Sequence, residues 1–213
     1  MNNISKRILT SIVLISLIYL SIKSSFFLLV LLLVISFLTI KEINLIFKRI
    51  FIKNSFSLFT ANLISVFYIS IFAIIIWNNL SSSYISMIFL LFICVMSDIG
   101  GFIFGKLIGG KKLTKISPNK TYSGCIGSFI FSLTFGYLFY YFQKNSLIFE
   151  INIFLLIILV SLFSQLGDLT ISFFKRKANM KDTGSILPGH GGILDRIDGI
   201  LVAIPLATML ISL

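Results

Sequence analysis

Long apolar runs separated by short polar segments dominate the sequence. Seven of these runs approach the length of about 20 residues that crosses the hydrocarbon core of a bilayer. They lie near residues 8–22, 25–40, 57–77, 84–105, 124–142, 151–174 and 197–213. The first run is short and follows two cations, but no small-x-small cleavage site follows it, so we expect a retained anchor. The pattern predicts an all-α, polytopic transmembrane protein with about seven spans.

The composition supports this fold class. Of the 213 residues, 57% are hydrophobic and 12% are charged, whereas a soluble domain carries about 25% charged residues. The apolar content excludes intrinsic disorder, and the 14 Gly, 3 Pro and 2 Cys exclude collagen-like and disulfide-scaffold proteins. Cys94 and Cys125 fall in or beside apolar segments, so we expect reduced packing residues and no disulfide.

The positive charge is concentrated in alternate loops. The formal net charge is +11, and 16 of the 18 Lys and Arg fall on one side of the predicted membrane. By the positive-inside rule, the N-terminus and the loops 41–56, 106–123 and 175–196 lie in the cytoplasm and the C-terminus lies outside. We therefore expect these cations to lie beside lipid headgroups, and we expect no nucleic-acid partner.

The sequence divides near residue 90. Residues 1–89 read as N-terminal transmembrane helices without a motif, and residues 90–213 as a catalytic transmembrane region, because every Gly and Pro lies beyond Ile99. The stretch 41–56 alternates basic and apolar residues in the manner of an interfacial helix. We expect no chemistry in that first part.

Four acids near span ends are candidate metal ligands. Each costs about 2.5–3.5 kcal/mol to place within the membrane, so each needs a reason. Asp98 precedes a run of small residues, Asp168 follows Gly167, and Asp195 and Asp198 share one helical face. Oxygen ligands without a Cys or His cluster suit Mg²⁺ better than zinc. A structural ion pair explains any single acid equally well; the joint arrangement favours a metal site.

Two basic loops carry candidate phosphate ligands. The loop after residue 174 holds Lys175, Arg176 and Lys181 beside glycines that let backbone N–H groups approach an anion. Lys177 in the same run is explained by topology alone. The segment 109–124, GGKKLTKISPNKTYSG, repeats the theme with Ser117, Lys120 and Thr121. Together with the acids, these loops indicate a site for Mg²⁺ and a polyphosphate on one membrane face.

The segment 172–198, SFFKRKANMKDTGSILPGHGGILDRID, resembles the signature of the phosphatidate cytidylyltransferases, the CDP-diacylglycerol synthases. The matching residues are Ser172, Lys175, Arg176, Lys181, Asp182, His190, Gly191, Gly192, Asp195, Arg196 and Asp198. SPNKTYSG resembles the family's Ser-Pro-Lys-Lys-Thr-x-Glu-Gly element, from which Asn119 and Ser123 depart, and Asp98 resembles its Asp-x-Gly segment. The resemblance covers about residues 90–213.

The resemblance implies transfer of a cytidylyl group from CTP to phosphatidic acid, giving CDP-diacylglycerol and pyrophosphate, with Mg²⁺ and a second, monovalent cation, K⁺. The implied metal ligands are Asp168, Asp195 and Asp198, with Asp98 as a second choice, and the implied charge-neutralising residues are Lys175, Arg176, Lys181 and Arg196. The implied substrate contacts are Ser117, Lys120, Thr121, Ser172, Asp182, His190, Gly191 and Gly192. By analogy with the family, we expect the protein to lie in a bacterial-type inner membrane, to have its active site on the cytoplasmic side, and to form a homodimer.

Three alternatives stay open on the sequence alone. A CTP-dependent polyprenol or phytol kinase would need a base for its hydroxyl nucleophile. A cytidylyltransferase for another anionic lipid would need a different lipid groove. A small ion transporter would use the four acids as an ion pathway and would show no nucleotide dependence.

Overall fold

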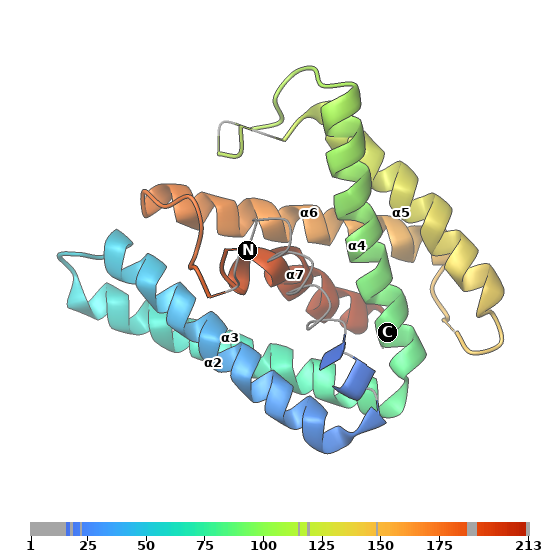
Figure 1. Ribbon diagram of the computed structural model, residues 1–213, viewed down its shortest axis with the longest axis horizontal. Coiled ribbons are helices and arrows are strands. Elements are labelled where there is room, and N and C mark those ends of the chain that lie inside the picture. Colours follow the sequence, from blue (N-terminus) through green and yellow to red (C-terminus); the bar gives the residue numbers. More distant parts are fainter. Residues whose placement is uncertain are drawn as a thin grey trace, which may run out of the picture. The chain divides into compact units, whose positions relative to one another are not determined.

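The described residues of this computed structural model form six long helices (Figure 1). The description covers residues 16–17, 19–21, 23–114, 116–118, 120–147, 149–186 and 191–211. The helices are α2 (Ser25–Ile50), α3 (Ser55–Ser82), α4 (Tyr84–Leu107), α5 (Tyr122–Phe142), α6 (Ile153–Lys177) and α7 (Leu194–Ile211). Within these residues there is no strand, and Lys112 and Thr121 form an isolated antiparallel bridge. The predicted all-α class is confirmed.

Five of the described helices, α2 to α6, are long and apolar enough to cross a membrane. This finding indicates an integral membrane protein. α7 is not among the five; its 18 residues include three charged side chains, those of Asp195, Arg196 and Asp198. The span predicted at residues 8–22 falls largely outside the described residues. The count of seven spans and the orientation therefore stay predictions.

The chain forms two compact units. The first consists of Met1–Ser82 and Phe174–Ile197, and the second of Ser83–Phe173 and Asp198–Leu213. The last turn of α6 and the first turn of α7 thus belong to the first unit. By its motifs, the sequence divides near residue 90. That division differs from these two compact units and stays a prediction.

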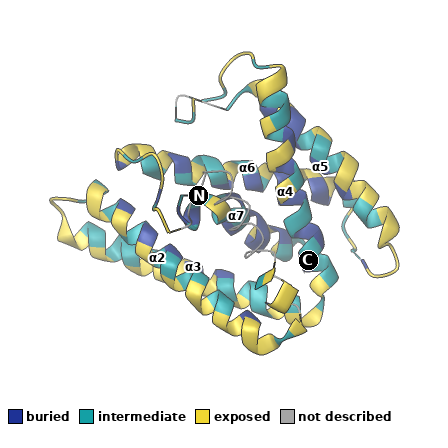
Figure 2. Ribbon diagram, viewed as in Figure 1, coloured by how far each residue is buried: buried dark blue, intermediate teal, exposed yellow. Residues whose placement is uncertain are grey.

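In the first unit, α2 and α3 lie side by side and are joined by a short turn (Figure 1). Asn54 begins α3, because its side-chain oxygen accepts a hydrogen bond from Ser57 N at 3.0 Å. Residues 41–50, which belong to the segment predicted as an interfacial helix, are helical and continue α2 to Ile50; their position at the interface stays a prediction. Many large apolar residues of both helices are exposed, and much of both ribbons has the colour of exposed residues in Figure 2. Such a surface suits contact with acyl chains.

In the second unit, glycines bring α4 and α5 together. A Cβ on Gly124 would lie 2.8 Å from Gly101 O, and a Cβ on Gly100 would overlap the backbone of Gly127. The predicted close approach of small residues is therefore confirmed here. Gly109 differs: it lies beyond the end of α4 with a φ of 63°, a left-handed conformation that favours glycine.

The two cysteines are packing residues, as the sequence predicts. Cys94 is buried in α4, Cys125 is half-buried in α5, and both thiols are free. Neighbouring apolar side chains fill the same unit; the rings of Phe89 and Phe139, for example, lie 5.7 Å apart. The core of the second unit thus needs no covalent link.

Candidate functional site

A cavity of about 290 Å³ lies in the second unit, where α4, α5 and α6 meet the segment that precedes α5. Its lining residues are Asp98, Gly101, Phe102, Leu113, Ser117, Lys120, Thr121, Gly124, Cys125, Ser128, Gln165, Asp168 and Leu169. Five of the predicted site residues are therefore brought together, although they come from three separate stretches of sequence: Asp98, Ser117, Lys120, Thr121 and Asp168.

An ion pair faces this cavity. Lys120 Nζ lies 2.5 Å from Asp168 Oδ2. The side chain of Lys120 is 25% exposed to solvent, and that of Asp168 is 32% exposed. Ser172 Oγ donates to the other carboxylate oxygen of Asp168 at 3.3 Å. An ion pair this accessible contributes little to stability. Its charges are instead available to a ligand in the cavity.

The segment before α5 is held in place by short-range contacts. Thr121 caps α5, since its hydroxyl oxygen accepts a hydrogen bond from Gly124 N at 3.1 Å. Leu113 N donates to Lys120 O at 2.8 Å. Ser123, which stands where the related motif has Glu, donates from its hydroxyl to Gly109 O. These contacts fix the backbone from which Lys120 projects.

Two of the predicted metal ligands flank a close helix crossing within the second unit. A Cβ on Gly167 of α6 would lie 2.5 Å from Asp198 O and 3.0 Å from Gly199 Cα. A Cβ on Gly199 of α7 would lie 2.6 Å from Ser164 Oγ. Asp168 follows one of these glycines and Asp198 precedes the other. The crossing therefore brings the backbones that carry these two acids together.

The donor set in the second unit fits a hard divalent cation. Among the residues that the structure describes, no three His, Cys, Asp or Glu side chains form a cluster able to hold a metal by themselves. Mg²⁺, however, is commonly bound by one or two carboxylates together with the phosphates of a substrate. Asp98, Asp168 and Gln165, whose side chains carry hard oxygen donors, line one cavity. The Mg²⁺ assignment stays a prediction.

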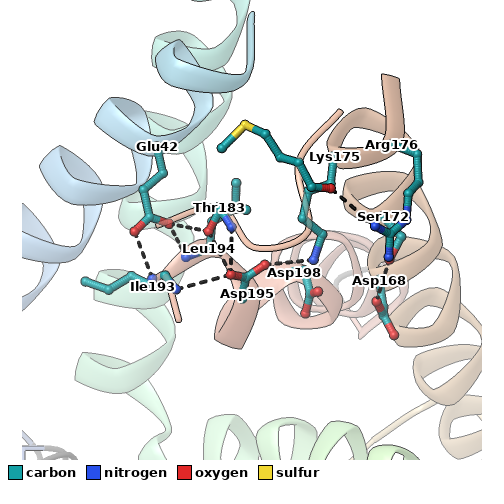
Figure 3. A network of polar contacts seen from close by, with 12 residues as sticks. Glu42, Asp168, Ser172, Lys175, Arg176, Thr183, Ile193, Leu194, Asp195 and Asp198 are labelled. Carbon is teal, nitrogen blue, oxygen red and sulfur yellow. Dashed lines mark hydrogen bonds and ion pairs between the residues drawn. The ribbon is translucent and has the colours of Figure 1, made fainter. Parts of the chain in front are cut away.

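In the first unit, Asp195 holds the loop between α6 and α7 (Figure 3). One carboxylate oxygen accepts a hydrogen bond from Lys175 Nζ at 2.7 Å. The other accepts from Thr183 N at 2.9 Å, from Thr183 Oγ1 at 3.0 Å and from Gly192 N at 3.1 Å. Both oxygens of Asp195 are thus engaged by the loop and by Lys175.

The same contacts set the ionisation of Asp195. Burial acts to raise the pKa of this carboxyl. The hydrogen bond and charge of Lys175 and the backbone N–H groups of Thr183 and Gly192 outweigh burial, so the pKa of Asp195 lies below its ordinary value. Asp195 is therefore a carboxylate at neutral pH. Gly191, which has a φ of 84°, packs beside this carboxylate.

Glu42 of α2 belongs to this network and was missed by the sequence analysis. Its side chain is buried, and it accepts hydrogen bonds from Thr183 Oγ1 at 2.7 Å, Leu194 N at 2.9 Å and Ile193 N at 3.0 Å. One signal was available: Glu42 is the only acid among the first 97 residues. A lone carboxylate in an apolar helix is costly and suggests a specific partner.

The remaining predicted residues have different positions. Arg176 Nη1 donates to Met180 O at 3.3 Å, a contact that closes the end of α6. Ser172 and Gly192 are buried, whereas the exposed predicted residues are Arg176, Lys181, Asp182 and Arg196. His190 lies outside the described residues, as does Asn119.

The family model and the similar curated proteins point to the same family. The family described as the "Cytidylyltransferase family" matches residues 50–213. A phosphatidate cytidylyltransferase of Staphylococcus haemolyticus (strain JCSC1435) is 41% identical over 165 residues, which cover 75% of this chain and 62% of that protein. Proteins of the same name from Staphylococcus aureus (strain COL) and Staphylococcus epidermidis are 40% identical over the same shares. The chain thus spans 62% of the length of these curated relatives.

Proposed function

Because the chain belongs to the cytidylyltransferase family, we propose that it transfers a cytidylyl group from CTP to phosphatidic acid in the membrane. The products are CDP-diacylglycerol and pyrophosphate. The names of the similar staphylococcal proteins support this substrate pair. The observation that carries the proposal is the cavity of the second unit, where the Lys120 ammonium and the carboxylates of Asp98 and Asp168 face one space between apolar helices.

The proposed reaction needs charge neutralisation more than proton transfer. A phosphate oxygen of phosphatidic acid attacks the α-phosphorus of CTP, the bond between the α- and β-phosphates breaks, and pyrophosphate leaves with the bonding electrons. A phosphate monoester has a second pKa of about 6, so the nucleophile is already largely a dianion at neutral pH. No general base is required. The barrier is the approach of this dianion to the phosphates of the nucleotide.

Each described group has a role in this proposal. Lys120 contacts phosphate oxygens, and Asp168 holds the Lys120 ammonium in the cavity. In the first unit, Lys175 supplies a cation that Asp195 orients, and the exposed Arg176, Lys181 and Arg196 neutralise further phosphate charge. Asp98, Asp168 and Asp198 are the proposed ligands of Mg²⁺. When bound, Mg²⁺ lowers the negative charge of the triphosphate and favours its reactive arrangement.

Asp195 stays a proposed metal ligand on the sequence pattern alone. Its contacts with Lys175, Thr183 and Gly192 support a second role, which is to hold the loop. A monovalent cation, K⁺, and a homodimer are proposed from the family resemblance.

We propose that the active site faces the cytoplasm from a bacterial inner membrane. The alternation of cations between predicted loops supports this orientation. Phosphatidic acid would enter laterally from the inner leaflet, with its acyl chains in the bilayer, while water-soluble CTP would arrive from the cytoplasm.

The position of the label in CTP distinguishes this reaction from its alternatives. Purified protein in detergent is given CTP labelled with ³²P at either the α- or the γ-phosphate, with phosphatidic acid or a polyprenol as acceptor. We expect label in lipid only from α-labelled CTP and only with phosphatidic acid. Lipid labelled from γ-labelled CTP would instead show a kinase. Ion flux across liposomes without any nucleotide dependence would favour a transporter.

A matched pair of lysines tests the cavity itself. Lys120→Ala removes the cation that faces Asp168, and we expect transfer to fall about 10- to 100-fold. Lys112→Ala removes an exposed cation of the same segment, and we expect transfer close to that of the wild type. Equal activity of the two variants would remove Lys120 from the site.

A further inference from the structure

The Glu42 side chain is buried, since the residue is only 1% exposed, yet it comes from a helix that carries no other site residue. All three hydrogen bonds that it receives within the described residues come from the loop that joins α6 to α7 or from the first residue of α7 (Figure 3). A buried carboxylate is stable only where such donors replace its lost water. The loop and the start of α7 therefore supply the donors that stabilise the buried Glu42 carboxylate.

Glu42 holds the loop at both of its ends. Thr183 lies near the start of the loop and donates its hydroxyl to Glu42 at 2.7 Å. Ile193 and Leu194 lie where the loop becomes α7, and both donate their backbone N–H groups. These amides have no partner within α7, since the first N–H groups of a helix cannot bond internally. One side chain thus closes the loop and caps the helix.

The packing around Glu42 explains two glycines of the loop. A Cβ on Gly184 would lie 2.8 Å from Glu42 Oε1, and a Cβ on Gly192 would lie 2.5 Å from Glu42 Oε2. Real Cβ atoms do not approach an oxygen so closely. The loop therefore lies so close to the carboxylate that a larger residue at either position would force the buried Glu42 side chain to shift.

The contacts continue from Glu42 to a candidate phosphate ligand. The hydroxyl of Thr183 lies between Glu42 Oε2 and Asp195 Oδ2, at 2.7 Å and 3.0 Å. The other oxygen of Asp195 accepts from Lys175 Nζ at 2.7 Å. Movement of Glu42 would therefore move Thr183 and Asp195, and with them the Lys175 ammonium.

We propose that Glu42 is a positioning residue, which holds the loop between α6 and α7 and, through Thr183 and Asp195, orients Lys175 toward substrate phosphate. This inference rests on the proposed function for its catalytic consequence. Glu42 lies upstream of residues 50–213, which are the residues that match the family. A segment outside the family match thus completes the loop that carries the signature.

Amide hydrogen exchange tests the anchoring without any need for activity. Glu42→Gln keeps the size of the side chain but replaces one carboxylate oxygen by an amide NH₂ group, which cannot accept a hydrogen bond from the loop. Glu42→Ala removes all three contacts. We expect the amides of Ile193 and Leu194 to exchange about tenfold faster in Glu42→Ala and to an intermediate degree in Glu42→Gln. Peptides from α4 and α5 should exchange as in the wild type. The matched control is Glu150→Gln, which changes the chain's other, exposed glutamate.

Steady-state kinetics test the catalytic consequence. We expect kcat/KM for CTP to fall about 10- to 100-fold in Glu42→Ala, with the larger part restored in Glu42→Gln. Thr183→Val should add little to Glu42→Ala, because both variants break the same chain of contacts.

Three results would overturn the proposal. They are loop exchange in Glu42→Ala equal to that in Glu150→Gln, faster exchange throughout both units, and full additivity with Thr183→Val. A wild-type protein that transfers no cytidylyl group would overturn the proposed function instead, and the exchange data would still decide whether Glu42 anchors the loop.

Discussion

Gly192→Ala places a single methyl group at the tightest point of the loop. The added carbon would overlap Thr183 Oγ1 and would lie 2.5 Å and 2.7 Å from the two oxygens of Glu42. Thr183 is 0% exposed and Glu42 is 1% exposed, so neither side chain can yield by moving into solvent. Gly192 is not among the described glycines with positive φ, so alanine can adopt its backbone conformation. The cost is therefore steric.

The size of this effect follows from the contacts that must yield. A carbon atom rests about 3.3–3.6 Å from an oxygen, so the Glu42 carboxylate must retreat by nearly 1 Å. Overpacking of a filled core costs about 1–3 kcal/mol, and the loss of one hydrogen bond to a charged group costs about 1.5–3 kcal/mol. We expect the free energy of unfolding to fall by about 3 kcal/mol, which lowers the unfolding temperature by about 6–12 °C.

Thermal unfolding of the purified protein in detergent measures this effect. Gly105→Ala in α4 is the matched control, because its Cβ would lie 3.3 Å from the nearest atom, Thr121 Oγ1. In a helix the same change also gains up to about 1 kcal/mol of helix propensity, so we expect no loss of stability. Unfolding of Gly192→Ala at the wild-type temperature would contradict tight packing of the loop against Glu42.

Three further predictions follow from the described contacts. Lys175→Met removes a hydrogen bond and a charge that hold the pKa of Asp195 below its ordinary value of 3.8, so the stability that this carboxylate supplies above pH 3.8 and loses as pH falls should be smaller in the variant, which unfolding at a series of pH values measures. Gly127→Ala drives a methyl into Phe104 and should lower the unfolding temperature by separating α4 from α5; an unchanged temperature would contradict that packing. Lys177→Ala removes an exposed cation and should leave cytidylyl transfer near the wild-type rate, whereas a loss as large as that of Lys175→Ala would show a role for Lys177.

The helices of the second unit could be predicted closely from the sequence. The run at 84–105 corresponds to α4 (Tyr84–Leu107), and the run at 124–142 corresponds to α5 (Tyr122–Phe142). Apolar length decides where such helices lie, and the helix ends follow from local features such as the Thr121 cap. The glycine contacts between α4 and α5 were predictable for a similar reason, because spacing alone places small residues on one helical face.

The partners of the charged groups could not be predicted from the sequence. Glu42 and Thr183 are 141 residues apart in the chain, and no periodic pattern connects them. The sequence also gives no reason why Lys120, and not another cation of its loop, pairs with Asp168. Such pairs depend on how the elements pack in three dimensions. The motif resemblance singles out Asp195 as a predicted metal ligand, but only the structure reveals that its oxygens hold the loop.

The metal dependence of cytidylyl transfer in Asp198→Asn tests the proposed function most directly. Purified wild-type and variant proteins receive α-³²P-labelled CTP and phosphatidic acid with and without Mg²⁺, and unfolding temperatures confirm that both are folded. We predict labelled CDP-diacylglycerol from the wild type only with Mg²⁺, and none from the variant. Labelled product at near wild-type rates from Asp198→Asn, or from the wild type without a divalent cation, would contradict the proposed function.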